Sequence, residues 1–158
     1  MSLGLFLYRT MEPNFSELSV EHGSIIASRF ADDSNEVSKS VKVAKWSGSL
    51  YFANAAYFET KLLELIAKNN EELKYIIVDV ASIVQVDASG EQVLSGLVET
   101  CSNSGVEILF ARTERLEAEL FRSGFKKRFG DNRFFDLRAD ALKYVWQELE
   151  DIKNVDEE

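Results

Sequence analysis

The feature that most constrains the fold is the run YIIVDV at residues 75–80. It is nearly continuous in apolar side chains, and most of these are β-branched. Such a run is typical of a central strand covered on both faces, whereas a strand with one wet face alternates apolar and polar side chains. The chain is therefore expected to contain a sheet with other elements packed above and below it.

Strand and helix patterns alternate along the rest of the chain. Strands are predicted at residues 41–46, 50–52, 75–80, 106–110 and 134–135, and amphipathic helices at residues 55–66, 93–101, 116–121 and 142–152. The turn signal Ser47-Gly48 separates the first two strands, which would form an antiparallel hairpin. Strands that alternate with helices indicate parallel pairing through crossovers. The prediction is an α/β fold with a small mixed, mainly parallel β-sheet and about four helices packed on it.

Capping signals bound these helices. Asn54 is expected to cap the first helix, because its side chain can accept a hydrogen bond from the first turn. Thr113 is expected to cap the third helix, and Gly105 to stop the second.

Residues 1–40 differ from the rest in composition. From residue 10 onward they are rich in Ser, Glu, Asp and Asn, and they include the only proline, Pro13. One short apolar patch, residues 25–27, is interpreted as an edge strand. We predict a tether over residues 1–40, a core domain over residues 41–152 and an acidic tail over residues 153–158.

Composition excludes several classes of protein. The net charge is -9, which disfavours a nucleic-acid binder because such proteins carry a basic stripe. The longest apolar stretch is broken by Asp79 and Gln85, so no membrane span is expected. With one cysteine, Cys101, and one histidine, His22, we expect neither an internal disulfide nor a metal site, and we expect no cofactor.

No set of residues organises a reaction. A Ser-His-Asp hydrolase would need His22 beside a serine, yet His22 lies in the tether and there is no GxSxG motif. A phosphate-binding Walker loop is also missing from the sequence. We therefore expect no catalytic residues and no enzymatic activity.

The turn at residues 87–90 is the candidate functional site. In one interpretation it only starts a helix: Ser89 with Gln92 forms a capping box, Asp87 faces the positive helix end and Gly90 eases the turn. In the other interpretation, Ser89 is an exposed serine where a phosphate would meet unpaired amides. A phosphate there would alter a docking surface without refolding the domain.

Three segments resemble a known family. GSLYFANA at residues 48–55, the run at residues 75–80 and VDASG at residues 86–90 resemble the STAS domain, in particular the cytoplasmic C-terminal domain of SulP-type sulfate permeases. GVEILFA at residues 105–111 and SGF at residues 123–125 extend the similarity, which covers about residues 41–146. The Asp-x-Ser-Gly motif is shared with bacterial anti-sigma factor antagonists, in which a partner kinase phosphorylates the serine.

The resemblance implies roles for single residues. The phosphoacceptor corresponds to Ser89, the leading aspartate of the motif to Asp87, and the glycine to Gly90. Two positions depart from the pattern: Ala88 replaces a serine common in the antagonists, and Glu91 replaces the usual leucine. The carboxylate of Glu91 should repel an approaching phosphate.

The resemblance also implies a function. It predicts a non-catalytic regulatory and assembly domain of a sulfate-type anion permease, at the cytoplasmic face of the inner or plasma membrane. Its expected partners are the membrane domain of the same transporter and a regulatory protein or kinase. The complete transporter is expected to be a homodimer and the isolated domain a monomer. The alternative is a free-standing anti-sigma factor antagonist that works by partner switching.

Basic residues gather in an otherwise acidic chain. They are Arg112, Arg115, Arg122, Lys126, Lys127 and Arg128. The simpler interpretation is a solvated helix face. In the other, Arg122, Lys126, Lys127 and Arg128 face anionic lipid headgroups or the cytoplasmic loops of the transporter.

Overall fold

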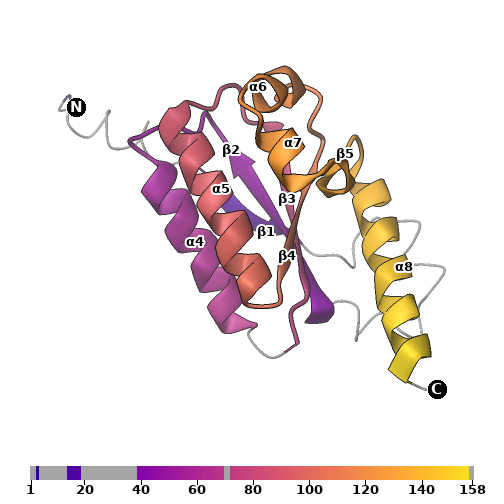
Figure 1. Cartoon of the computed structure of the whole chain (residues 1–158). Coiled ribbons are helices and arrows are strands. Elements are labelled where there is room, and N and C mark those ends of the chain that lie inside the picture. The colour runs from indigo at the N-terminus through magenta and orange to yellow at the C-terminus, as the bar shows by residue number, and fades with distance from the viewer. Residues whose placement is uncertain (1–2, 4–13, 19–38, 70–71, 157–158) are drawn as a thin grey trace.

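The computed structural model describes residues 3, 14–18, 39–69 and 72–156, in which helices cover a five-stranded sheet (Figure 1). The strands are β1 (Asn14–Leu18), β2 (Val41–Ser47), β3 (Tyr75–Ser82), β4 (Glu107–Ala111) and β5 (Phe134–Phe135). The helices are α4 (Ala55–Lys68), α5 (Ala88–Asn103), α6 (Glu117–Arg122), α7 (Phe125–Phe129) and α8 (Arg138–Asp156), with a 3₁₀ turn at Asp131–Arg133.

The strands lie side by side in chain order, β1-β2-β3-β4-β5. β1 is antiparallel to β2, and the other three pairs are parallel. Tyr75 at the start of β3 lies opposite Val41 on one side and Glu107 on the other, so β3 is the central strand. The expected mixed, mainly parallel sheet is confirmed.

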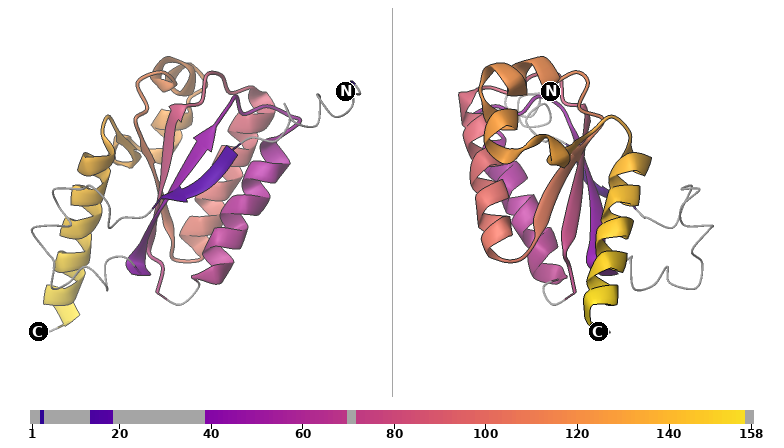
Figure 2. Two further views of the ribbon diagram at one scale, coloured as in Figure 1. Left: turned by 180° about the vertical axis from the view of Figure 1, so that it is seen from behind. Right: turned by 45° about the vertical axis from the view of Figure 1, so that its right-hand side comes forward.

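Helices cover both faces of this sheet (Figure 2), and a hydrophobic core lies on each face. Helices α4 to α7 pack on one face, where Ile76 and Val78 of β3 are buried. Helix α8 packs on the other face, against Tyr75 and Ile77 of the same strand. Covering on both faces explains why β3 has no polar alternation, as its sequence indicated.

Helices α4 and α6 begin and end within two residues of the expected bounds. In contrast, α5 starts five residues before its predicted range, α8 extends four residues beyond its range at both ends, and α7 was not predicted. Four buried side chains form the predicted stripe of α4, namely Ala55, Phe58, Leu62 and Leu65. Gly105, with φ at 78°, follows the end of α5 as a left-handed glycine. Asn54 does precede α4, but its side chain makes no capping hydrogen bond, so that part of the prediction is wrong.

The predicted hairpin of residues 41–46 and 50–52 is wrong. Leu50 makes a single parallel bridge to Val86, and the chain then turns into α4. The antiparallel partner of β2 is instead β1, which lies within the predicted tether. There Phe15 lies opposite Trp46 and packs against the core on the α4 face. The edge strand expected at residues 25–27, like His22, lies outside the described residues.

The acidic tail does not begin at residue 153, because α8 continues to Asp156 with the same helical geometry. Its last two turns carry exposed side chains, including Ile152 and Val155. Across the described ranges, none of the helices combines the length and the apolar character needed to cross a membrane. Within the same ranges, no group of His, Cys, Asp and Glu side chains is arranged to hold a metal ion.

Candidate functional site

Residues 87–90 are the N-cap and the first three residues of helix α5, which begins near the carboxyl ends of the parallel strands (Figure 1). Asp87 is extended (φ −88°, ψ 179°) and is the N-cap of α5. Its Oδ1 accepts a hydrogen bond of 2.9 Å from the amide of Gly90. The predicted capping box of Ser89 and Gln92 is therefore wrong, because Asp87 takes the capping position and Ser89 is already helical.

Asp87 also holds a second loop in place. Its other oxygen, Oδ2, accepts a hydrogen bond of 3.1 Å from the amide of Phe52. Beside this contact the Asp87 amide donates to the carbonyl of Leu50 at 3.1 Å, and the Leu50 amide donates to the carbonyl of Gln85 at 2.9 Å. The GSLYFANA and VDASG segments therefore form one surface, although they are far apart in the chain.

Asn54 shapes the first of these loops from inside. Its side chain is buried, and Nδ2 donates a hydrogen bond of 2.7 Å to the carbonyl of Ser49. Its Oδ1 accepts one of 3.0 Å from the amide of Tyr51. Both bonds curl residues 49–54 into a turn, because they satisfy backbone groups that a strand would have to pair.

Gly90 is required by contact rather than by turn geometry. A Cβ at this position would lie 2.6 Å from the carbonyl oxygen of Leu50 and 3.0 Å from the side chains of Leu50 and Val86. The backbone of Gly90 is not left-handed, so the expectation that it eases a tight turn is wrong. Its missing side chain lets the start of α5 approach the Leu50 loop.

Two groups at this surface are open to a partner. The hydroxyl of Ser89 makes no hydrogen bond with any described residue, and the residue is only partly buried. The side chain of Phe52 is 76% exposed, although its amide is bound to Asp87. Glu91 lies in the first turn of α5, and Glu119 of α6 accepts a hydrogen bond of 3.3 Å from the amide of Val86. The surface thus combines an exposed aromatic ring, a free hydroxyl and nearby carboxylates.

The basic residues do not form one free patch. Lys126 lies 2.7 Å from Glu117 and 3.7 Å from Asp131, and its pKa is raised mainly by the hydrogen bond to Glu117. Arg128 binds the hydroxyl of Ser95 on α5. Lys127 is exposed, and so is Arg122, whose Nε donates to the carbonyl of Ala118. The membrane-facing role of Arg122, Lys126, Lys127 and Arg128 stays a prediction.

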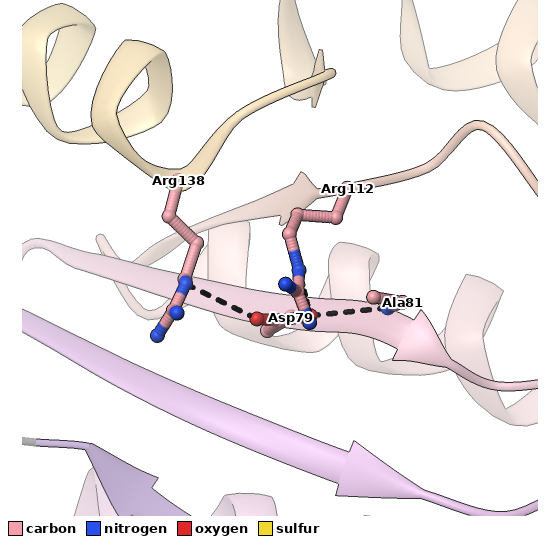
Figure 3. Close-up of polar contacts among 4 residues, drawn as sticks. All are labelled: Asp79, Ala81, Arg112 and Arg138. Atoms are coloured by element: carbon pink, nitrogen blue, oxygen red, sulfur yellow. Dashed lines mark hydrogen bonds and ion pairs between the residues drawn. The ribbon is translucent and has the colours of Figure 1, made fainter.

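A second polar cluster lies on the other face of the sheet, where α8 packs (Figure 3). Asp79 of β3 has no exposed surface. Its Oδ1 lies 3.1 Å from Nε of Arg112 and its Oδ2 lies 3.2 Å from Nε of Arg138. The amide of Ala81 also donates to Oδ1 at 3.0 Å. Arg112, grouped with the basic cluster in the sequence, therefore belongs to a different site.

The sequence carried only a weak signal for this cluster. A charged residue inside a strand covered on both faces has to be paired with an opposite charge. Asp79 in the run of residues 75–80 therefore indicates a basic residue nearby in the fold. Its partners could not be chosen from the sequence, because Arg112 is 33 residues away and Arg138 starts a different element. The same limit applies to Phe52, whose amide meets Asp87 over a separation of 35 residues.

The structure is a mixed α/β domain, and the loops of residues 49–54 and 86–90 lie near the carboxyl ends of its parallel strands. The model of the STAS domain family matches residues 34–141. The chain belongs to the STAS domain family. A comparison with curated protein sequences gave no match.

Solved structures with the same fold include domains of transporters. A sulfate transporter family protein from Wolinella succinogenes is 28% identical, with a TM-score of 0.62 over 70% of this chain and 88% of that chain. The SulP transporter STAS domain from Vibrio cholerae is 21% identical, with a TM-score of 0.58 over 76% of this chain and 98% of that one. The murine anion transporter Slc26a9 is 20% identical with a TM-score of 0.66; the match spans 92% of this chain but 24% of that transporter.

Proposed function

We propose that the chain is a non-catalytic regulatory and assembly domain of a sulfate-type anion permease. The domain over residues 41–152, with β1 at its edge, would lie at the cytoplasmic face of the membrane, joined to the transporter through the N-terminal segment. Its partners are the membrane domain of the same transporter and a regulatory protein or kinase. The complete transporter would be a homodimer.

The similarity to transporter domains supports this proposal. The protein from Wolinella succinogenes belongs to a sulfate transporter family, and its match to this chain covers most of both chains. The murine protein Slc26a9 is an anion transporter, and the part of it that matches this chain is 24% of its length. That proportion is expected for one domain of a longer membrane protein.

The observation that carries the docking role is the pairing of residues 49–54 with residues 86–90. The two carboxylate oxygens of Asp87 hold the start of α5 and the Phe52 amide, so both loops are fixed before any partner arrives. A preorganised surface binds with less loss of conformational entropy than a mobile one. Phe52 supplies exposed apolar area, which is the usual centre of a docking contact. We therefore assign docking to this surface.

Regulation by phosphorylation is the finer part of the proposal. The Ser89 hydroxyl makes no hydrogen bond with a described residue, and it lies in the first turn of a sixteen-residue helix. A phosphate there would be favoured by the helix dipole and disfavoured by Glu91 and Glu119. The surface would change its charge while the domain keeps its fold.

The test uses the complete transporter with Ser89→Glu and Ser89→Ala, at matched expression. Anion uptake and recovery of bound proteins are measured for both variants. We expect Ser89→Glu to change uptake or partner binding, because it places a negative charge on the docking surface, while Ser89→Ala retains the unmodified behaviour. If both variants stay at the wild-type level in both assays, the loop has only a structural role.

A further inference from the structure

The cluster around Asp79 contains more positive charge than the carboxylate needs. Asp79 is fully buried, and the Nε atoms of Arg112 and Arg138 lie 3.1 Å and 3.2 Å from its two oxygens. One cation neutralises a buried carboxylate, so the second leaves an excess of positive charge at this point. Figure 3 shows both guanidinium groups reaching the same carboxylate from separate elements, α8 and the end of β4.

A third basic residue lies on the neighbouring strand β2. Lys45 of β2 is the register partner of Asp79 in the parallel β2–β3 pair. Since Val41 and Val43 of the same strand belong to the core under α8, the alternation of a strand places Lys45 on that face as well. Lys45 forms no ion pair with a described residue. Three basic residues therefore surround the position of Asp79 on the α8 face, and two of them, Arg112 and Arg138, pair with its carboxylate.

Both arginines keep hydrogen-bond donors available. Arg112 donates from Nε to Oδ1 of Asp79, whereas Nε of Arg138 makes an ion pair with Oδ2 without a hydrogen bond. No terminal nitrogen of either arginine forms a hydrogen bond with a described residue. The side chain of Arg112 is 39% exposed and that of Arg138 is 43% exposed. Solvent therefore reaches part of both arginine side chains, while the buried carboxylate of Asp79 restrains their orientation. This is the arrangement in which guanidinium groups bind oxyanions in pairs of hydrogen bonds.

The backbone at Arg112 is strained. Its φ is 58°, and it is the only residue other than glycine with a positive φ in the described part of the chain. The left-handed region is costly for a residue with a Cβ, and such strain often accompanies functional sites. Here the amide of Arg112 donates to the carbonyl of Phe135 at 2.8 Å, which holds the strand end in place. The site lies where parallel strands end, the usual position for ligands in open α/β sheets.

We infer that Arg112, Arg138 and Lys45 bind a free tetrahedral oxyanion, inorganic sulfate or phosphate, with Asp79 as the residue that positions the two guanidinium groups. The binding is noncovalent, and Asp79 itself does not touch the anion. The site lies on the α8 face, opposite the face that carries α5 and the docking surface. It does not depend on the proposed docking function.

The experiment follows the side-chain Nε–Hε signals of the arginines by nuclear magnetic resonance in the full 158-residue chain. Sodium sulfate or sodium phosphate is added while sodium chloride keeps the ionic strength constant. Thermal stability is not a suitable signal, because sulfate stabilises folded proteins generally by exclusion from their surface. We expect saturable shifts of the Arg112 and Arg138 signals with either oxyanion, and none when chloride alone is exchanged for another monovalent anion.

Three variants make the test specific. Lys45→Gln removes one cation without touching the ion pairs of Asp79 and should weaken binding roughly fivefold. Arg138→Lys keeps the charge but loses the planar fork, and should weaken it roughly tenfold. Lys127→Gln removes an exposed cation of α7, on the other face, and should leave the affinity unchanged. Should Arg138→Lys fail to fold, Lys45→Gln still decides.

Several outcomes would overturn the inference. These are shifts that grow without saturation, wild-type affinity in Lys45→Gln, or an equal loss in Lys127→Gln, which would indicate only general attraction between charges. A nucleoside monophosphate serves as the last probe. If it binds while inorganic sulfate and phosphate do not, the site recognises more than an oxyanion and the assignment to a free ion fails.

Discussion

At Gly90 the start of helix α5 comes so close to the Leu50 loop that no side chain fits between them. The Cβ of an alanine would lie 2.6 Å from the carbonyl oxygen of Leu50, which is backbone and cannot move aside as a side chain can. This one position therefore links the geometry of the capping turn to that of the GSLYFANA loop. A glycine that looked like a turn residue in the sequence acts through packing.

Gly90→Ala should lower the free energy of unfolding by about 1–3 kcal/mol, because the added methyl group forces the two loops apart. Gly96→Ala is the matched control, since it lies in the same helix with no atom within 4 Å of its Cβ. That control should raise stability by about 0.5–1 kcal/mol through the better helix propensity of alanine. Urea denaturation measures both. Equal effects of the two substitutions would contradict the close approach.

Burial changes the ionisation of the Cys101 thiol. The thiol lies in the core on the α5 face, and burial raises its pKa from 9.0 to about 11. The folded state therefore keeps the proton that the unfolded chain releases first, and the stability from this group is present below pH 9 and lost as the pH rises towards 11. We expect urea denaturation to show a smaller loss of stability between pH 8 and pH 11 in Cys101→Ala than in the wild type. An identical loss would contradict this role of the thiol.

At the scale of elements, the start of α5 depends on one aspartate. Asp87→Ala removes the acceptor for the amides of Gly90 and Phe52, so it should lower the free energy of unfolding by about 1–2 kcal/mol. Ser89→Ala, two residues on, should change it by less than about 0.5 kcal/mol, because its hydroxyl has no partner among the described residues. Thermal or urea denaturation separates the two. A larger loss for Ser89→Ala would restore the capping box that the sequence suggested.

The long elements could be predicted because their patterns extend over many residues. The run at residues 75–80 predicted a strand covered on both faces, and the stripe from Ala55 to Leu65 predicted α4. Shorter features depended on contacts that the sequence does not encode locally. The second strand of the predicted hairpin does not form because Asn54 binds Ser49 and Tyr51, and β1 pairs with β2 across a long intervening segment.

The candidate site was predictable only in part for the same reason. A helix start with an acidic and a hydroxyl side chain could be located at residues 87–90, but a choice between Asp87 and Ser89 as the cap depends on the φ and ψ angles of the turn. The proximity of Phe52 depends on the loop before α4 crossing to Asp87. The Asp79 cluster depends on three elements meeting at one carboxylate.

At the scale of the whole molecule, the sheet separates two surfaces. Helices α4 to α7 cover one face and α8 covers the other (Figure 2). The proposed docking surface of residues 49–54 and 86–90 lies on the side of α4 and α5, and the cluster around Asp79 lies on the side of α8. Both surfaces lie near the carboxyl ends of the parallel strands, which is the usual position for ligand sites in open α/β sheets. In our two proposals, the domain meets a partner on one side and binds a small anion on the other.

The most direct test of the docking function removes the exposed ring of Phe52 from the complete transporter. Phe52→Ser deletes apolar contact area that is 76% exposed, so it should leave folding intact while changing anion uptake and partner recovery. Val155→Ser is the control, since that side chain is 74% exposed at the far end of α8. At matched expression, we predict an uptake rate that is altered for Phe52→Ser and unchanged for Val155→Ser. Wild-type uptake and partner recovery in Phe52→Ser would contradict this prediction.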